Sequence, residues 1–194
     1  MAAVSASNVW AVGSQPVTSG IGRSGLAMHY NGTSWTASPL PAPRVPVNGE
    51  WELSAVSAGS AGDVWATGFV SNADGLVEHA IVEHFNGTRW SLTRAPDLGP
   101  SYPINTFNTV LALSPSNVWA IGQSATGNQT KPVVPLVEHF NGTRWTVQAA
   151  PSLSGNSILS FDGLVTTGSV TLWSVGSRNP NGTTNWQTLT ARYS

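Results

Sequence analysis

The chain has 194 residues, only 9% of them are charged, and the formal net charge is −1. This balance excludes the basic surface that recruits nucleic acid or anionic membranes. The absence of cysteine excludes disulfides and thiolate metal sites. No apolar run reaches the roughly 20 residues needed to cross a bilayer, so we expect no membrane insertion.

A fourfold internal repeat organises the chain. The segment NVWAVG recurs as DVWATG, NVWAIG and TLWSVG, and its tryptophan stands at positions 10, 65, 119 and 173. We expect this tryptophan to be a core residue between neighbouring units, because an indole buries a large area. With 40% apolar residues the chain is long enough for one domain with a sizeable core. We therefore expect a single domain over 1–194, with repeat units at about 1–48, 49–105, 106–158 and 159–194.

Each unit is predicted to hold short strands in the same order. The first strands are expected at 3–6, 53–58, 110–114 and 164–167. The second strands are the tryptophan segments, and the third are expected at 26–30, 81–85, 136–140 and 189–193. The fourth strands begin at Trp35, Trp90 and Trp145, and the last unit has none. Short apolar segments between Gly, Pro, Asn and Ser are typical of strands and turns.

Four-stranded units at this period predict an all-β fold, a β-propeller of four repeats. Three blades are complete, and the fourth lacks its outer strand. Three arrangements of the ends fit this pattern: a compact four-bladed ring, a fragment of a longer propeller, or a homo-oligomer. The oligomer would form through the unpaired edge from Leu189 to Tyr193, because free strand edges invite strand addition.

The nine residues VEHFNGTRW occur twice without change, at 82–90 and 137–145, and a looser copy stands at 27–35. Asn-Gly between two strands is the strongest short hairpin signal, because a type I′ turn needs positive φ at both positions. We therefore predict such turns at Asn31-Gly32, Asn86-Gly87 and Asn141-Gly142.

Units that join DVWATG to HFNGTRW resemble the bacterial Asp-box or BNR-like propeller repeats and, more distantly, tectonin-type lectin repeats. The resemblance implies a propeller fold of the kind found in secreted and surface proteins. It implies little about function, because propellers host many activities. HFNGTRW lacks the Ser and Asp of the Asp-box pattern Ser-x-Asp-x-Gly-x-x-Trp, so a sialidase is not implied.

The repeated polar residues favour structural roles. His29, His84 and His139 recur on the third strands, which lie two strand spacings of about 4.8 Å from the inner strand, so they diverge and cannot share a metal ion. Glu83 and Glu138 correspond to Met28 and Ala191 in other units, which argues against catalytic carboxylates. We therefore predict no metal, no cofactor and no catalytic residue.

A ligand is expected on the face that carries the long, variable loops. Candidate ligand-binding residues there are Trp51, Phe69, His79, Tyr102, Phe107, Arg178 and Trp186. A second set, one per blade, is Trp35, Trp90 and Trp145, provided that these rings face outward.

Low charge, abundant Ser, Thr and Asn, and aromatic residues outside the repeat positions suit saccharide stacking. We therefore expect a non-catalytic, secreted or cell-surface binding or scaffold propeller, with a glycan as the most specific ligand (lectin-like). The alternative is a structural or assembly subunit that holds protein partners through its edge strand and loop face. A glycoside-active hydrolase or lyase ranks lowest.

Overall fold

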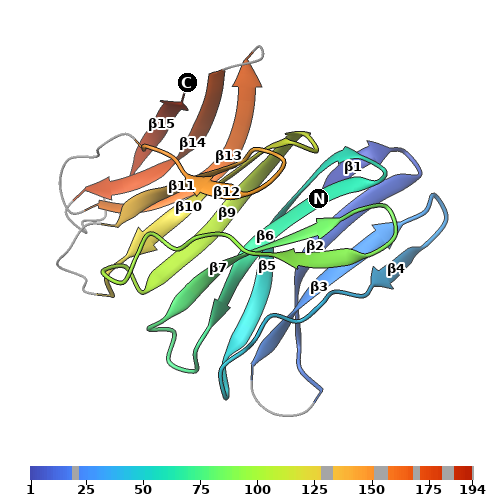
Figure 1. Ribbon diagram of the computed structural model, residues 1–194, viewed down its shortest axis with the longest axis horizontal. Helices are drawn as coiled ribbons and strands as arrows, with labels where there is room; N and C mark the ends of the chain where they lie inside the picture. Colours follow the sequence, from blue (N-terminus) through green and yellow to red (C-terminus); the bar gives the residue numbers. More distant parts are fainter. Residues whose placement is uncertain (19–21, 128–132, 151–156, 168–170, 181–185, 194) are drawn as a thin grey trace.

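The computed structural model describes residues 1–18, 22–127, 133–150, 157–167, 171–180 and 186–193 (Figure 1). Within these ranges the chain is all β and contains no helix, and hence none that could span a membrane. The strands are β1 Ala2–Ser5, β2 Asn8–Pro16, β3 Arg23–Tyr30, β4 Trp35–Ser38, β5 Glu50–Ser60, β6 Asp63–Ser71, β7 Glu78–Phe85, β8 Trp90–Thr93, β9 Ile104–Ser114, β10 Asn117–Ala125, β11 Val134–Phe140, β12 Trp145–Val147, β13 Ser157–Thr167, β14 Thr171–Pro180 and β15 Gln187–Tyr193.

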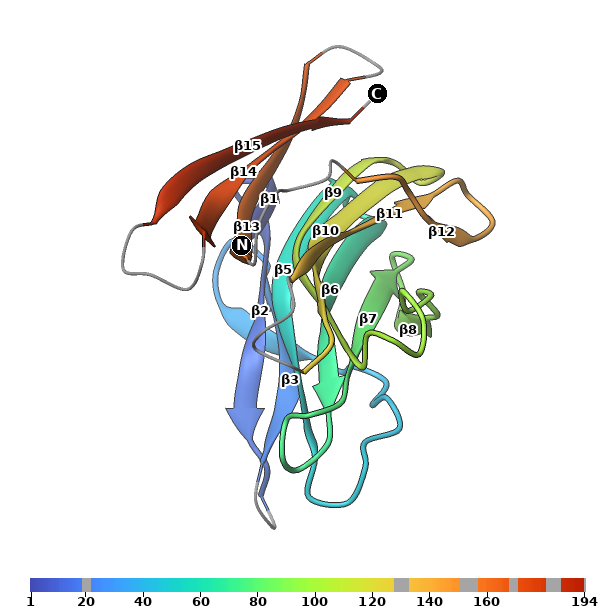
Figure 2. The same ribbon diagram turned by 90° about the vertical axis from the view of Figure 1, so that its left-hand side faces the viewer.

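Neighbouring strands pair antiparallel within four units, here called unit 1 (β1–β4), unit 2 (β5–β8), unit 3 (β9–β12) and unit 4 (β13–β15). A single parallel bridge, Glu78 to Ile104, joins units 2 and 3 into one eight-stranded sheet. The units follow one another like the leaves of a fan, from β1–β4 to β13–β15 (Figures 1 and 2). The predicted all-β class and the expected strand order are confirmed.

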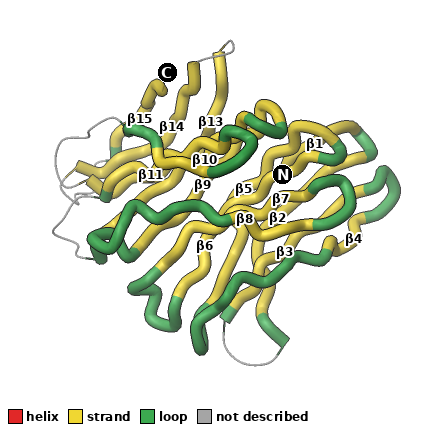
Figure 3. The backbone as a smooth tube through the Cα atoms, viewed as in Figure 1, coloured by secondary structure: helices red, strands yellow, loops and turns green. Residues whose placement is uncertain are grey.

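Up-and-down pairing sends the connections alternately to two ends of the strands (Figure 3). One end, the tight-turn end, carries the β1–β2 and β3–β4 turns and their equivalents in the later units. The opposite end, the long-loop end, carries longer connections, such as 39–49 between β4 and β5 and 94–103 between β8 and β9. The two ends follow directly from the strand order that the sequence predicts.

The inner strands are longer than predicted. β5, β9 and β13 each have 11 residues, and each carries a register shift at an equivalent place, across Ser54, Asn108 and Asp162. Opposite this bulge stands the glycine of the tryptophan segment, Gly68 or Gly122, where an added Cβ would lie 1.9 Å from a carbonyl oxygen of the inner strand. This close approach of two backbones is the reason for the recurring glycine.

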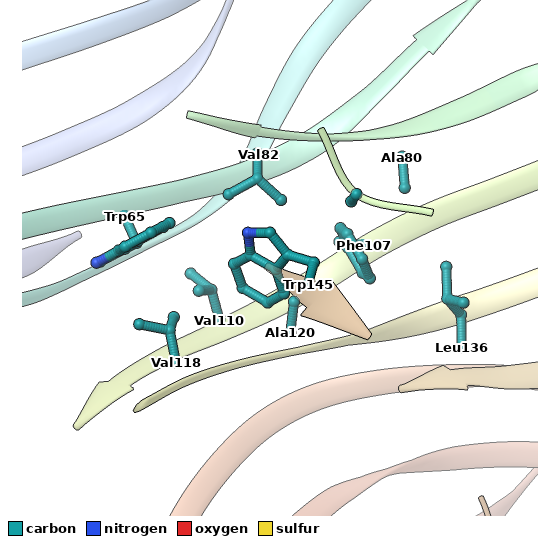
Figure 4. Packing of buried hydrophobic residues seen from close by; sticks show 10 residues of the cluster. Trp65, Ala80, Val82, Phe107, Val110, Val118, Ala120, Leu136 and Trp145 are labelled. Carbon is teal, nitrogen blue, oxygen red and sulfur yellow. The ribbon is translucent and has the colours of Figure 1, made fainter. Parts of the chain in front are cut away.

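The apolar core lies between consecutive units rather than within one sheet. Trp65 of unit 2 stacks on His84 with ring centroids 4.0 Å apart, and it also meets Phe140 and Trp145 of unit 3 at 5.0 and 5.8 Å. Figure 4 shows the surrounding cluster, in which Phe107 is also buried. The prediction that the repeated tryptophan is a core residue between units is confirmed for Trp10 and Trp65. It is wrong for Trp173, which is 37% exposed because no described unit packs on that side of unit 4.

The three third-strand histidines take structural roles, as predicted. His29, His84 and His139 each hydrogen bond at 2.9 Å to the side chain that begins the preceding strand, Asn8, Asp63 or Asn117. Burial lowers the pKa of His139, which favours the neutral ring. Because each imidazole also stacks on a tryptophan, the pair forms one rigid element of the interface between units.

The Asn-Gly turns exist, but the predicted type I′ geometry is wrong. Only the glycine of each turn has positive φ, as at Gly87 with φ 90°. The loop has four residues, and the Asn86 side-chain oxygen accepts from the backbone N–H groups of Thr88 and Arg89, both at 3.1 Å. The asparagine therefore acts through its side chain, as in an Asx turn, rather than through a left-handed backbone.

Substitution of Trp65 should unfold the chain much more readily than substitution of an exposed tryptophan. Trp65→Ala empties a fully buried site between two sheets, so we expect a loss of about 3–5 kcal/mol in the free energy of unfolding. The control Trp186→Ala removes a ring that is 55% exposed, and it should change that free energy by less than about 1 kcal/mol. Denaturant unfolding followed by circular dichroism measures both, and equal losses would contradict the core assignment.

Candidate active site

Three carboxylates gather at the long-loop end of unit 2. Glu50 and Glu52 stand at the start of β5, and Glu78 stands at the start of β7. Glu50 is level with Ser71 of β6, and Ser71 is level with Glu78, so Glu50 and Glu78 project from the same face of the sheet. One strand separates them, which places their backbones roughly 10 Å apart.

The three groups interact electrostatically. Burial raises the pKa of Glu78, and the negative charges of Glu52 and Glu50 raise it further. Ser14 of unit 1 donates to Glu52 Oε2 at 3.3 Å, and the Ser14 hydroxyl accepts from Arg23 Nε at 2.8 Å. Glu78 is therefore a carboxyl with a raised pKa in this group, while Glu52 accepts a hydrogen bond.

The start of β9 supports this site from the other side. The backbone N–H of Glu78 donates to the carbonyl of Pro103 at 2.8 Å. Buried Asn105 holds the incoming loop, because its side-chain oxygen accepts from Leu98 N at 3.1 Å and its amide donates to the Tyr102 carbonyl at 2.6 Å. These bonds fix the backbone at Glu78 against unit 3, so the carboxylate is carried on a rigid element.

A His–Asp pair lies next to Glu78 in the chain. His79 Nδ1 and Asp97 Oδ2 are 2.8 Å apart, and both residues are exposed. With Arg94 they line an open hollow of about 380 Å³ beside the free edge of β7, where β8 has ended. Because successive side chains of a strand point to opposite faces, His79 and this hollow lie on the other face of β7 from Glu78.

Glu83 and Glu138 are a different kind of carboxylate. Both side chains are fully buried, and none of their oxygens has a hydrogen-bond partner within the described ranges. Burial raises the pKa of each to about 8, and for Glu138 the charge of Asp97 adds to the effect. With both oxygens of each group out of solvent's reach, neither residue can act on a substrate in this conformation.

The predicted ligand residues fall into two groups. Trp51 packs on Gly25 and is buried, and Phe107, Trp90 and Trp145 are also buried in the core between units, so none of them can stack on a ligand. The core takes these rings because each lies where one sheet covers the next. The partly or fully exposed candidates are Trp35, Phe69, His79, Tyr102, Arg178 and Trp186.

Sequence reasoning missed Glu50, Glu52 and Glu78, because it searched the repeat positions for chemistry. These residues interrupt the repeat: Arg23 takes the place of Glu78 in unit 1, and Ile104 takes the place of Glu50 in unit 3. Seven of the nine acidic residues lie in the second repeat unit, and this concentration is a signal that could have indicated the site. Among the described residues, no group of three or more His, Asp or Glu is arranged to hold a metal ion.

Comparisons with known proteins show the fold. No protein-family model and no curated protein matches the chain. A solved structure of Penicillium chrysogenum alpha-L-arabinanase, complexed with arabinobiose, matches with a TM-score of 0.53 at 11% identity, over 87% of this chain and 53% of the arabinanase chain. The chain thus spans about half the length of that enzyme and has an all-β, propeller-like fold.

This similarity corrects two expectations. The chain was expected to be a non-catalytic binding or scaffold module, or an assembly subunit, and not an enzyme. A solved protein that shares its fold is an arabinanase. The expectation of a non-catalytic module is therefore contradicted.

The buried glutamates should make the fold less stable at alkaline pH. Their carboxyls hold protons up to about pH 8 in the folded chain but only to about 4.5 when unfolded, so stability is full below pH 4.5 and falls as the pH rises to 8. The loss can reach about 5 kcal/mol for each group. Glu83→Gln and Glu138→Gln should each reduce the slope of melting temperature against pH.

The matched control is Asp162→Asn, which neutralises an exposed carboxylate. This variant should keep the wild-type slope between pH 4.5 and 8. If the two glutamine variants kept that slope as well, the buried carboxyls would not be protonated in the folded chain.

Proposed function

We propose that the chain is a carbohydrate-active hydrolase on a four-bladed propeller, with Glu50, Glu52 and Glu78 as its acid–base group. The observation that carries this proposal is the half-buried Glu78 carboxyl, whose pKa is raised by burial and by two neighbouring carboxylates. Glycoside hydrolysis uses two carboxyl groups on either side of the scissile bond, and the acid of the pair has a raised pKa.

In the proposed reaction Glu78 donates its proton to the leaving oxygen as the glycosidic C–O bond breaks. A water oxygen bonds to the anomeric carbon, and Glu50 or Glu52 takes the proton of that water. Inverting enzymes hold their two carboxyl groups about 6.5–9.5 Å apart to leave room for the water. The backbones of Glu50 and Glu78 are roughly 10 Å apart, and their side chains project from the same face of the sheet. This separation fits that range, so we propose that the reaction inverts the configuration of the anomeric carbon.

The substrate class follows from the fold relative and from the surroundings of the site. The solved relative is an arabinanase complexed with arabinobiose, so an α-L-arabinan is the first substrate to test. Arg23 and Ser14, next to Glu52, supply polar atoms for sugar hydroxyls.

The four units are proposed as propeller blades, three with four strands and the last with three in the described ranges. The recurring NVWAVG and NGT segments support membership in the Asp-box or BNR-like repeats. A secreted or cell-surface location is proposed on the same resemblance, and it suits a polymeric substrate.

Glu78→Gln should abolish hydrolysis without loss of fold. Because the amide cannot donate the proton, we expect the release of reducing sugar from α-L-arabinan to fall by about 10²–10⁴ in kcat. In the wild type the rate should decline as the pH rises through the raised pKa of Glu78. Glu83→Gln, on the same strand but buried away from the site, is the control and should keep the wild-type rate.

Two outcomes would overturn the proposal. One is no sugar release by the wild type from α-L-arabinan, arabinobiose or other neutral polysaccharides. The other is a Glu78→Gln variant that retains the wild-type rate and pH profile.

A further inference from the structure

The interface between units 1 and 2 and that between units 2 and 3 share one design. On one side a tryptophan stacks on a histidine: Trp10 on His29, with centroids 4.4 Å apart, or Trp65 on His84. We call this side of a unit its Trp–His face. On the other side the following unit presents two aromatic rings, which we call its aromatic-pair face. In unit 2 these rings are Phe85 and Trp90, which meet Trp10 at 4.8 and 5.4 Å.

The aromatic-pair face is built the same way each time. The two rings lie 5.5 Å apart in Phe85–Trp90 and again in Phe140–Trp145 of unit 3. Where the preceding unit covers this face, Trp90 and Trp145 are each only 4% exposed. The faces of units 2 and 3 therefore show how this geometry looks when it is covered, and the uncovered faces of units 1 and 4 can be compared with them.

Unit 1 carries an aromatic-pair face with nothing described on it. Tyr30 and Trp35 lie 5.4 Å apart, as in units 2 and 3. Ala27 and His29 point toward unit 2, so Tyr30 and its cross-strand neighbour Trp35 point the opposite way. Trp35 is 43% exposed. The aromatic-pair face of unit 1 thus has the same geometry as those of units 2 and 3. Within the described residues, no tryptophan of another unit covers it.

Unit 4 carries the complementary open face. Leu172 packs toward unit 3, so Trp173 points away from it, and Trp173 is 37% exposed. Val165, directly opposite Trp173, and Val175, two residues further along, share this face and are exposed as well. Arg192 pairs with Trp173 where the other units have histidine. Unit 4 thus presents an exposed apolar stripe centred on the repeat tryptophan.

We infer that a second copy of this chain docks head to tail, with Trp173 of one copy on Tyr30 and Trp35 of the other. The contact continues the interface that joins units 1 and 2 and units 2 and 3, because its two sides are the same two faces. It is heterologous, so two copies close a ring when each copy uses both faces. This assignment does not depend on the proposed hydrolase activity.

The length of the fold relative agrees with a second copy. The alignment that covers 87% of this chain covers only 53% of the arabinanase chain. Nearly half of the arabinanase chain therefore has no counterpart in one copy, which leaves room for a second copy.

Sedimentation or light scattering across concentrations tests the inference. The wild type should form a dimer, and Trp35→Ala and Trp173→Ala should each weaken self-association at least tenfold, because each substitution removes one half of both contacts in the ring. Trp186→Ala, which removes an exposed ring outside both faces, is the matched control and should associate like the wild type. Circular dichroism spectra that match the wild type would show that the variants are folded.

Mixing the two variants separates this pairing from one in which each face docks on the same face of the other copy. Trp173→Ala retains an intact Tyr30–Trp35 face, and Trp35→Ala retains an intact Trp173 face. An equimolar mixture should therefore restore one heterologous contact and form a dimer that neither variant forms alone. A wild type that stays monomeric at all concentrations, or a dimer that survives both substitutions, would overturn the inference. So would a mixture that does not associate.

Discussion

Trp10 and Trp65 each lie between an imidazole of their own unit and two aromatic rings of the next unit. A four-stranded sheet of this length has two apolar faces and too little area to bury either alone. Each unit therefore depends on its neighbour for the cover of its central strands. The stack fixes the distance and the angle of that neighbour, so the order and spacing of the fan follow from one repeated contact.

The same repetition explains where chemistry can arise. The side chains at repeat positions pack in the interfaces between units, and the carboxyls of Glu83 and Glu138 are buried as well. The long-loop end escapes this constraint, because the inner strands continue beyond their bulge and the sequence there differs between units. In unit 2 that extension carries Glu50 and Glu52, and Glu50 is level with Glu78 across β6. A functional site on a rigid strand end combines variability with precise placement.

The fold relative and the carboxylate site are independent observations about different features of the chain. Similarity at 11% identity concerns the backbone only. The interaction among the three carboxylates comes from this chain's own side chains. The binding hypothesis was based on exposed aromatic rings, whereas the proposed function is based on the carboxyl groups of Glu50, Glu52 and Glu78. One of those rings, Trp35, gains another explanation, because Trp35 and Trp173 lie on the two uncovered faces of a repeated interface.

By itself the sequence determined the repeat, the strand order, the turn positions and the core role of Trp10 and Trp65, because these depend on local periodicity and on residues that recur. The tertiary structure decided the rest. Trp51 and Phe107 could not be told from exposed loop aromatics, since their burial depends on the sheet of an adjacent unit. Glu50 and Glu78 are 28 positions apart in the chain and meet only through the pairing of β5, β6 and β7. Electrostatic coupling acts through space, so only the folded chain could reveal it.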